Sequence, residues 1–375
     1  MGRVTLQTVA DQVGVSRMTV SNAFSKPDQL SAALRKRILA AADELGYVGP
    51  DPAGRALARG TSGAVGILLT DSVSYAFTDE VATGFLGAIA DEFAPTGVAL
   101  TLLSTTASED IVPARDVPLD GAVVYSCDTS SPALAWLVRR SLPLVFVDQL
   151  PAPGITSVNV DDRAGAAAAA RHLVELGHRR IDIVNKNMHG PFGVLLEPDA
   201  ELDVDHQVSQ QRSLGWLDVD HYVSRQRLLG WLDELGNAGL KSRLVHQPQS
   251  NADDGYAAAL LLLEQDDPPT ALLCFSDVMA NGVVRAAESL GLQVPEDLSV
   301  VGFDDSPLAS RMRPALTTVR QPVVDKGHTA AAALTTMIER ARSGADKARA
   351  RHFLLPTELV VRDSTAPPRP ASKRL

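Results

Sequence analysis

Residues 4–24 of this chain read VTLQTVADQVGVSRMTVSNAF, and their pattern predicts the structure of the N-terminal part. Its apolar residues recur every three or four positions in two short runs, which is the spacing of an α-helix. Thr5 and Ser16 precede the runs as N-cap residues, and Gly14 ends the first run. Two short helices joined by a glycine turn predict a helix-turn-helix unit, whose second helix enters the major groove of DNA.

The sequence predicts a third helix between a cap at Ser31 and a stop at Gly46, with three consecutive basic residues at 35–37 on its outer face. Residues 1–60 hold eight lysines and arginines against five acidic residues, a net charge of +3. The remainder holds 27 against 40, a net charge of −13. A basic head attracts phosphate, while an acidic body avoids unspecific binding to polyanions.

The second helix points a polar face outward, because Val20 and Phe24 occupy its inner face. Arg17 lies in its first turn, where a guanidinium can fork onto a guanine edge, worth about 1–3 kcal/mol of discrimination. Short hydroxyl side chains and a tyrosine suit contacts to phosphates. A plain three-helix bundle with a solvated face is the alternative, although Thr, Ser and Asn are poor helix formers. The predicted DNA-binding residues of the head are Thr5, Ser16, Arg17, Met18, Thr19, Ser21, Asn22, Ser31 and Tyr47.

From Gly63 onward, short apolar runs alternate with amphipathic stretches, which is the pattern of parallel βαβ units. Helices are expected between the strands, for example at 164–176 and 278–290, each closed by a glycine. The body is therefore predicted to be an α/β structure with parallel sheets. The predicted strands are residues 65–70, 98–103, 121–125, 144–147, 181–184, 271–275 and 298–303.

The length of 375 residues is too great for one ordinary core and indicates two or three structural units. Apolar residues make up 45% of the chain, which is enough to bury such cores. No apolar run reaches the roughly 18 residues that span a bilayer, and the first residues lack the apolar core of a signal peptide. Two cysteines, Cys127 and Cys274, are too few for a disulfide framework or a zinc cluster. We therefore expect a soluble protein of the cytoplasm.

Seven motifs of this chain resemble the lac-repressor (LacI/GalR) family of transcriptional regulators. The resemblance implies an N-terminal all-α helix-turn-helix head and an α/β effector domain of two lobes, similar to periplasmic sugar-binding proteins. The motifs are VTLQTVA at 4–10, GVS at 14–16, TVSN at 19–22, LGHRRI at 176–181, VPED at 294–297, VGFDD at 301–305 and PALTTV at 314–319. The implied organisation is a head at 1–48, a linker with a hinge helix at 49–62, an effector-binding and dimerisation domain at 63–365, and a disordered tail at 366–375.

The linker contains a short helical pattern. Asp51 can cap it, Pro52 suits the first helical position, and Gly60 ends it. A helix this short does not persist alone, and a flexible tether is the alternative. The hinge helix of the family folds on operator DNA and inserts a leucine wedge into the minor groove, which bends the duplex. Leu57 matches that leucine, so the resemblance adds Leu57 to the predicted DNA-binding residues.

Aspartates follow several predicted strands of the body, where ligands of open α/β sheets bind. The resemblance places Asp148, Arg227 and Asp304 where the family contacts its effector, and it places Asp71, Tyr75 and Phe77 in a loop that lines the other lobe. Carboxylates beside an arginine suit a polyhydroxyl ligand, because the carboxylates accept from hydroxyls and the guanidinium donates. The predicted effector-binding residues are Asp71, Tyr75, Phe77, Asp148, Arg227, Asp277 and Asp304.

The alternative for any of these aspartates is a helix cap or a strand end without a ligand. We prefer that interpretation for Asp161 and Asp162, which stand directly before a predicted helix. For Asp148 and Asp304 we favour contact with a ligand.

Residues 204–218 and 219–233 are a tandem duplication, identical at twelve of fifteen positions. The family has one Arg-x-x-Gly motif here, whereas this chain has two, at Arg212 and Arg227. The second copy runs directly into a predicted helix, so we assign the pocket role to Arg227. His206 and His221 are then expected to be surface residues that are paired only by the duplication.

The leading prediction is an effector-controlled transcription regulator that acts as a repressor and whose homodimer reads a roughly palindromic operator. The effector is expected to be a sugar-like or nucleoside-like small molecule. The sequence carries no phosphate loop, nucleophile elbow or zinc motif, so we predict no enzyme activity, no cofactor and no metal. Two alternatives stay open: a cytosolic solute-binding protein, and an enzyme that processes sugars or nucleosides with the cleft aspartates.

Overall fold

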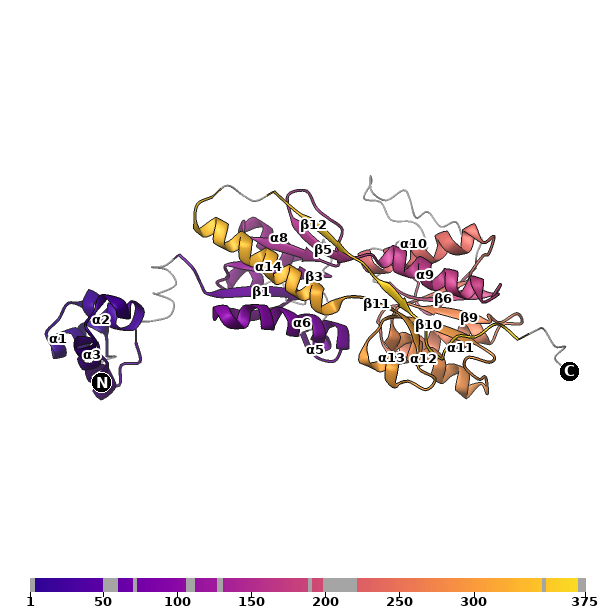
Figure 1. The fold of residues 1–375 in the computed structure, drawn as a ribbon, viewed down its shortest axis with the longest axis horizontal. Coiled ribbons are helices and arrows are strands. Elements are labelled where there is room, and N and C mark those ends of the chain that lie inside the picture. The colour runs from indigo at the N-terminus through magenta and orange to yellow at the C-terminus, as the bar shows by residue number, and fades with distance from the viewer. Residues whose placement is uncertain are drawn as a thin grey trace. The chain divides into compact units, whose positions relative to one another are not determined.

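A computed structural model describes residues 4–49, 60–69, 73–105, 112–126, 131–187, 191–197, 221–345 and 349–369. The chain forms two compact units. The first comprises residues 1–63 with 118–120, and the second comprises the remaining residues from Ala64 onward. Figure 1 traces the chain through both.

The first unit contains the predicted helix-turn-helix. Thr5, Ser16 and Ser31 each cap a helix by accepting a hydrogen bond from the backbone N–H three residues later. Gly14 ends the first helix in the left-handed conformation, with a φ of 72°. Apolar side chains from all three helices form its core, with Val9, Val20 and Ile38 among the buried residues. The elements are α1 (Leu6–Val13), α2 (Arg17–Ser25), the 3-10 turn η1 (Pro27–Gln29) and α3 (Ala32–Glu44).

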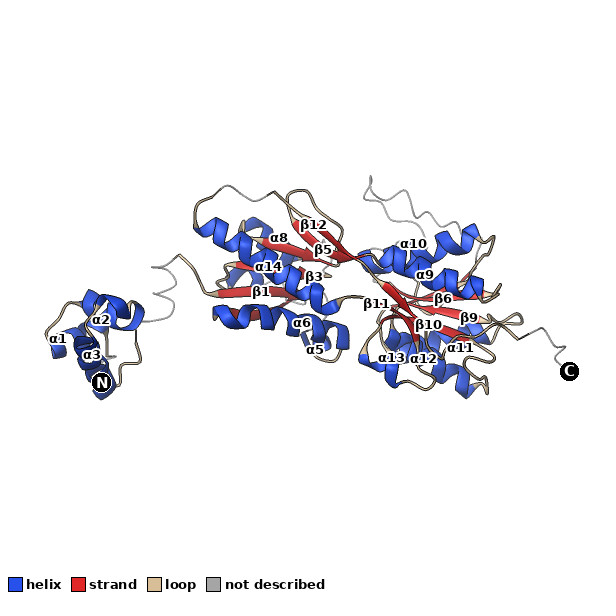
Figure 2. Ribbon diagram, viewed as in Figure 1, coloured by secondary structure: helices blue, strands red, loops and turns tan. Residues whose placement is uncertain are grey.

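The second unit consists of two lobes, each an open sheet with helices on both sides (Figure 2). The sheet of the first lobe is parallel throughout, in the order β12-β5-β4-β3-β1-β2. Its strands are β1 (Ala64–Leu69), β2 (Ala99–Ser104), β3 (Gly121–Tyr125), β4 (Leu144–Val147), β5 (Thr156–Val160) and β12 (His352–Leu355). Its helical elements are α5 (Val73–Ala76), α6 (Glu80–Phe93), η2 (Ala94–Thr96), α7 (Pro113–Asp116), α8 (Pro132–Arg139) and α14 (Val323–Arg342).

The sheet of the second lobe has the order β13-β11-β10-β9-β6-β8-β7, and its central strands are parallel while β13 and β7 are antiparallel to their neighbours. Its strands are β6 (Ile181–Lys186), β7 (Leu195–Leu196), β8 (Leu244–Gln247), β9 (Ala271–Cys274), β10 (Ser299–Asp304), β11 (Thr317–Arg320) and β13 (Glu358–Val360). Its helices are α9 (Asp162–Glu175), α10 (Tyr222–Asn237), α11 (Ala252–Leu263), α12 (Asp277–Ser289) and α13 (Pro307–Arg311).

The chain passes between the lobes where β5 leads to α9, where β11 leads to α14 and where β12 leads to β13. A close helix contact stands beside the first of these crossings. A Cβ atom on Gly230 would lie 2.2 Å from the Arg163 carbonyl oxygen, so only glycine lets α10 pack this tightly on α9. This approach brings the side chains of α10 to the start of α9.

All seven predicted strands are present, and their ends agree within one or two residues. The sequence reading missed β5, β7, β8, β11, β12 and β13, which include the strands on either side of the crossings. The predicted disordered tail begins too early, because Ala366 donates its N–H to Ser299 Oγ at 3.1 Å and Arg369 pairs with Asp297 at 2.6 Å. Residues 370–375 lie outside the described part of the chain.

Candidate functional site

The outer face of α2 carries the predicted DNA-reading side chains. Arg17 and Met18 in its first turn are exposed, Met18 to 71%, and Ser21 and Asn22 follow half-buried. The inner face is occupied by Val20 and Ala23, both fully buried. The amphipathic pattern therefore turns the same residues outward that the sequence predicted to meet bases.

The hydroxyl groups of the head have a structural role of their own. Thr5, Ser16 and Ser31 use their oxygens to cap helices, and Thr19 Oγ1 lies 2.8 Å from Ser16 Oγ. Tyr47 packs edge-to-face against Phe24, with ring centroids 5.8 Å apart. Each of these side chains is thus held in place, which is the condition for an oriented contact to a phosphate. Leu57 lies outside the described residues.

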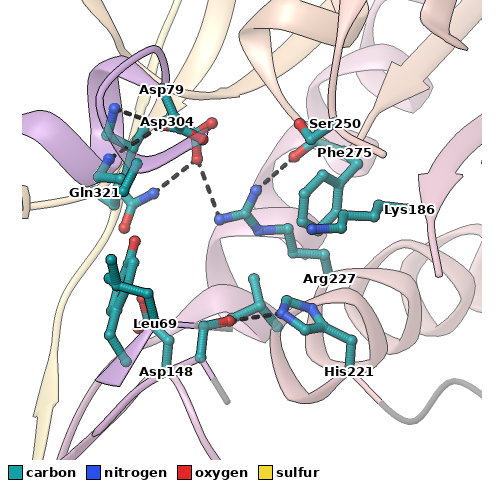
Figure 3. A pocket seen from close by; sticks show the side chains of 16 residues that line it. Leu69, Asp79, Asp148, Lys186, His221, Arg227, Ser250, Phe275, Asp304 and Gln321 are labelled. Carbon is teal, nitrogen blue, oxygen red and sulfur yellow. Dashed lines mark hydrogen bonds and ion pairs between the residues drawn. The ribbon is translucent and has the colours of Figure 1, made fainter. Parts of the chain in front are cut away.

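A cleft between the two lobes of the second unit holds an open pocket that side chains from both lobes line. Figure 3 shows its labelled side chains converging from both lobes. Three of the predicted effector residues, Asp148, Arg227 and Asp304, line it. The lining is Leu69, Ala76, Asp79, Val81, Ala82, Tyr125, Ser126, Asp148, Lys186, His221, Val223, Arg227, Ser250, Phe275, Asp304 and Gln321.

Arg227 is a buried cation of the second lobe. Its Nε donates to Asp162 Oδ1 at 2.8 Å, and a terminal nitrogen lies 3.2 Å from Asp304 Oδ1. The other terminal nitrogen donates to the Phe275 carbonyl oxygen at 2.5 Å. The guanidinium carbon lies 3.6 Å from the ring centroid of Phe303 and 4.6 Å from that of Phe275. These contacts fix the guanidinium in one position at the cavity wall (Figure 3).

The two carboxylates around Arg227 are strongly affected by burial. Burial raises the pKa of Asp162 to about 6, although Arg227 acts in the opposite direction. Burial also raises the pKa of Asp304, again against the effect of Arg227. The guanidinium therefore compensates carboxylates that the lobe has removed from water.

A second buried cation, Lys326, stands in the first lobe. Its Nζ donates to Asp148 Oδ2 at 2.5 Å and to Gln321 Oε1 at 2.8 Å. Gln321 in turn donates through Nε2 to Asp304 Oδ1 at 2.7 Å. A continuous polar chain thus connects Asp148 of the first lobe with Asp304 and Arg227 of the second.

Asp148 and Asp304 both have left-handed backbone conformations, with φ angles of 54° and 115°. Non-glycine residues seldom adopt these angles, and Asp304 is far outside the region that aspartate tolerates well. Asp148 directly follows β4 and Asp304 is the last residue of β10, and both line the cavity. The fold accepts backbone strain at two of the positions that present carboxylates to the cleft.

His221 contradicts its assignment as a surface residue, because its side chain is buried and lines the cavity. It caps α10: Nδ1 accepts from the Ser224 N–H at 3.4 Å. The proton of the neutral ring therefore lies on Nε2, which donates to Ser126 Oγ of the first lobe at 2.6 Å. Burial lowers the pKa of His221 to about 3, so the ring is neutral at physiological pH. One hydrogen bond thus joins a strand end of one lobe to a helix cap of the other.

Glu80 makes a further contact between the lobes. From the first turn of α6 it accepts the Leu308 N–H at 3.1 Å and the Arg311 guanidinium at 2.5 Å. Leu308 and Arg311 belong to α13 of the second lobe. The bonds of His221 and Glu80 hold the lobes together with protein groups alone.

The other four predicted effector residues do not line the cavity or lie wholly or partly outside the described part of the chain. Asp277 does not line the cavity: it is fully buried and accepts from Thr318 Oγ1 at 2.5 Å and from the Ser306 N–H at 2.7 Å, so its role is structural. Phe77 is 66% exposed and does not line the cavity either. Asp71 and the side chain of Tyr75 lie outside the described part of the chain.

Asp161 caps α9 as predicted, by accepting from the Ala164 N–H at 3.1 Å. Its neighbour Asp162 does more than a cap, because it is the partner of Arg227. The sequence reading also missed Lys326 and Gln321. The one available signal was the spacing of Lys326, which stands four residues before Ala330 on the buried face of α14.

Within the described ranges, no cluster of three His, Cys, Asp or Glu side chains has the arrangement of a metal site. The helices of the same residues are all too short or too polar to traverse a bilayer.

Known proteins resemble this chain over both units. Residues 5–49 match the family described as bacterial regulatory proteins, lacI family, and residues 212–365 match the periplasmic binding protein-like domain. An HTH-type transcriptional regulator of Mycolicibacterium smegmatis is 36% identical over 342 residues, covering 88% of this chain and 89% of that protein. The HTH-type transcriptional regulator IpsA of Corynebacterium glutamicum is 35% identical, covering 90% of this chain and 92% of that protein.

Solved structures agree with this relationship. The lac repressor dimer bound to operator and the anti-inducer ONPF has a TM-score of 0.73 at 25% identity, covering 97% of this chain and all of that one. A lacI-family regulator from Corynebacterium glutamicum has a TM-score of 0.65 at 28% identity, covering 98% and 99%. The head and the two-lobed body together define a ligand-responsive DNA-binding regulator. The chain belongs to the lacI family of bacterial regulatory proteins.

Proposed function

We propose that this chain is a repressor that binds a roughly palindromic operator as a homodimer. A neutral polyhydroxyl effector that enters the cleft lowers or raises the affinity of the homodimer for the operator. Its place of action is the cytoplasm, where the operator is. The lac repressor structure, a dimer on operator DNA, supports the assembly. A twofold protein requires a twofold site, with one head for each half-site.

In the head, we assign base contacts to Arg17, Met18 and Asn22, because these side chains lie on the outer face of α2. Phosphate contacts are assigned to the helix-start hydroxyls and Tyr47, which set the register of the head on the duplex. Leu57 is proposed as the minor-groove wedge. The proposed phosphate-contacting residues are Thr5, Ser16, Thr19, Ser21, Ser31 and Tyr47.

For the cleft, one observation carries the proposal: Asp148 Oδ1 is buried at the cavity and has no hydrogen-bond partner among the described atoms. An unpaired buried acceptor is costly unless a ligand donor reaches it. Asp304 and Arg227 offer an acceptor and a donor on the opposite wall, which suits a molecule with several hydroxyls. Asp71 and Tyr75 are proposed to complete the first-lobe wall.

The charges of the cleft favour a neutral ligand. Three carboxylates, Asp79, Asp148 and Asp304, line the cavity against two cations, Lys186 and Arg227. Arg227 already bonds to Asp162 and Asp304, and Asp148 to Lys326. A phosphate or carboxylate on the ligand would meet these acidic groups at short range in a site with little water. The structure of CelR with cellobiose, which has a TM-score of 0.65 and 25% identity to this chain, holds a neutral sugar in a related protein.

The cleft is proposed to bind its ligand without converting it. Acid–base hydrolysis needs two carboxylates that are free to exchange protons with the substrate. Here Asp148 is engaged by Lys326, and Asp304 by Arg227 and Gln321. A bound ligand should therefore be recovered unchanged after prolonged incubation.

The test combines two measurements on the full chain. A thermal-shift panel of neutral polyols, disaccharides and nucleosides, each beside its phosphate ester, should show stabilisation by one neutral member and none by its ester. Fluorescence anisotropy with operator duplex selected from a random library should show salt-dependent binding that the same compound alters. Asp148→Asn should abolish the thermal shift and keep operator binding. Tighter binding of the ester, or no duplex preference with any compound, would refute the proposal.

A further inference from the structure

The side chain of Asn22 on the reading face of α2 is held by a residue that lies outside that helix. Asn22 Nδ2 donates to Gln29 Oε1 at 3.1 Å. Gln29 is exposed and ends the 3-10 turn η1. Because an asparagine is short and rotates freely, an oriented partner decides which of its atoms faces outward.

The backbone between the two residues is tied to the same turn. The Lys26 N–H donates to the Asn22 carbonyl oxygen at 2.8 Å, and the Gln29 N–H donates to the Lys26 carbonyl oxygen at 3.1 Å. The side-chain bond closes this ring of contacts. Gln29 is therefore fixed relative to Asn22 by the chain itself and does not depend on a DNA contact.

With one amide hydrogen used by Gln29, Asn22 keeps its Oδ1 acceptor and a second N–H donor. Adenine presents an N7 acceptor beside an N6 donor in the major groove, and an amide fits this pair with two parallel bonds. Guanine offers two acceptors at the same place and cannot satisfy the amide oxygen.

We propose that Gln29 is a positioning residue that orients Asn22 for adenine, so that the two side chains act as one unit in reading one base pair per half-site. This rests on the proposed DNA-reading role of α2. Gln29 acts through Asn22 and does not itself read that base.

The experiment is selection of bound duplexes from a randomised library by the full chain at fixed moderate salt, followed by sequencing. Wild type should select adenine at one position per half-site, and Asn22→Ala should lose that preference. Gln29→Ala should lower the preference at the same position by about five- to tenfold and leave all others unchanged. Helical content measured by circular dichroism should be unchanged in Gln29→Ala, since Gln29 is exposed and lies outside α2.

Gln29→Glu is the matched variant. Its carboxylate accepts the same bond from Asn22, so the adenine preference should persist, while overall affinity falls because a negative charge approaches the phosphates. An unchanged preference in Gln29→Ala, or a change at a position that Asn22→Ala does not affect, overturns the positioning role. If Arg17→Ala lost the adenine preference and the Asn22 and Gln29 variants kept it, the positioning role of Gln29 would also be overturned. The regulator function would remain intact. A wild-type chain without any preference would refute the proposed function itself.

Discussion

Two arginines show how differently the head and the cleft use the same side chain. Arg17 lies exposed in the first turn of α2. Arg227 is buried, bonds to Asp162 and Asp304, and lies between two phenylalanine rings. An exposed guanidinium is available to a partner outside the chain, so its loss affects binding alone. A buried one belongs to the fold, so its loss affects stability and ligand binding together.

Replacing the buried arginine should have the largest effect. Arg227→Met leaves Asp162 and Asp304 without their cation, and removing one member of a buried pair typically costs about 3–5 kcal/mol of stability. Urea unfolding of the full chain, followed by the fluorescence of buried Trp231, measures this loss. Arg225→Gln is the control, because Arg225 is half-buried on the same helix and the first copy of the duplication has Gln210 at the equivalent position.

The same variant should show a defined pH dependence. Asp162 has a pKa of about 6 in the folded chain, above the value near 4 expected when unfolded. A carboxyl with a raised pKa binds more protons when folded, so its stabilising contribution is present below pH 4 and lost as pH rises through 6. Arg227 lowers the pKa of Asp162, so in its absence this pKa rises further. The variant should therefore lose more stability at pH 8 than at pH 5. Equal losses at both values would contradict this account.

The second largest effect is expected from Lys326, which pairs with one carboxylate where Arg227 pairs with two. Lys326→Met should destabilise the body by about 3 kcal/mol, because Asp148 is left buried without its cation. Adding Asp148→Asn should restore part of the stability, since no unpaired charge then remains. Thermal unfolding of the two single variants and the double variant forms the test cycle. A double variant no more stable than Lys326→Met would mean that the pair is not coupled.

The contrast between the two regions also explains what the sequence predicted. The reading face of α2 follows from helical spacing within nine residues, so Arg17 and Asn22 were found on the correct side. The cleft is assembled from residues far apart, and Lys326 lies 178 positions from Asp148. Local patterns carry no information on such a pair. Arg227 was placed at the cleft through family resemblance, and the two strained aspartates through resemblance together with their positions at strand ends. The same strand-end position misassigned Asp277, because it does not reveal where the side chain bonds.

The exposed arginine should show the opposite separation of effects. Arg17→Ala should leave the free energy of unfolding within about 0.5 kcal/mol of wild type. It should lose about 1–3 kcal/mol of discrimination at one base pair per half-site. Arg17→Lys is the sharper control, because it keeps the charge but not the fork, so the salt dependence should persist while the guanine preference falls. Unchanged selectivity in both variants would show that Arg17 does not read a base.

A smaller effect is expected at the contact between the lobes. Arg311→Ala removes the ion pair with Glu80. The side chains of Arg311 and Glu80 are 64% and 36% exposed, so the free energy of unfolding should fall by less than about 1 kcal/mol. Small-angle scattering of the ligand-free protein should nevertheless show a larger radius of gyration, because one of the contacts holding the lobes together is lost. Arg313→Ala is the matched control, since Arg313 donates to carbonyl oxygens of its own segment. Identical scattering from both variants would show that Glu80 does not hold the cleft closed.

The smallest effect is expected from deleting residues 204–218, the first copy of the duplication. Every buried residue of α10, including its cap His221, comes from the second copy or follows it. The deletion should therefore leave stability within about 0.5 kcal/mol of wild type. Deleting 219–233 instead places the first copy directly before Glu234. The two copies differ at three positions, and one of these differences puts Ser213 where buried Leu228 stands. That chain should be about 2–4 kcal/mol less stable, because a buried leucine is lost. If the two deletions unfold at the same urea concentration, the second copy has no special fit to α10.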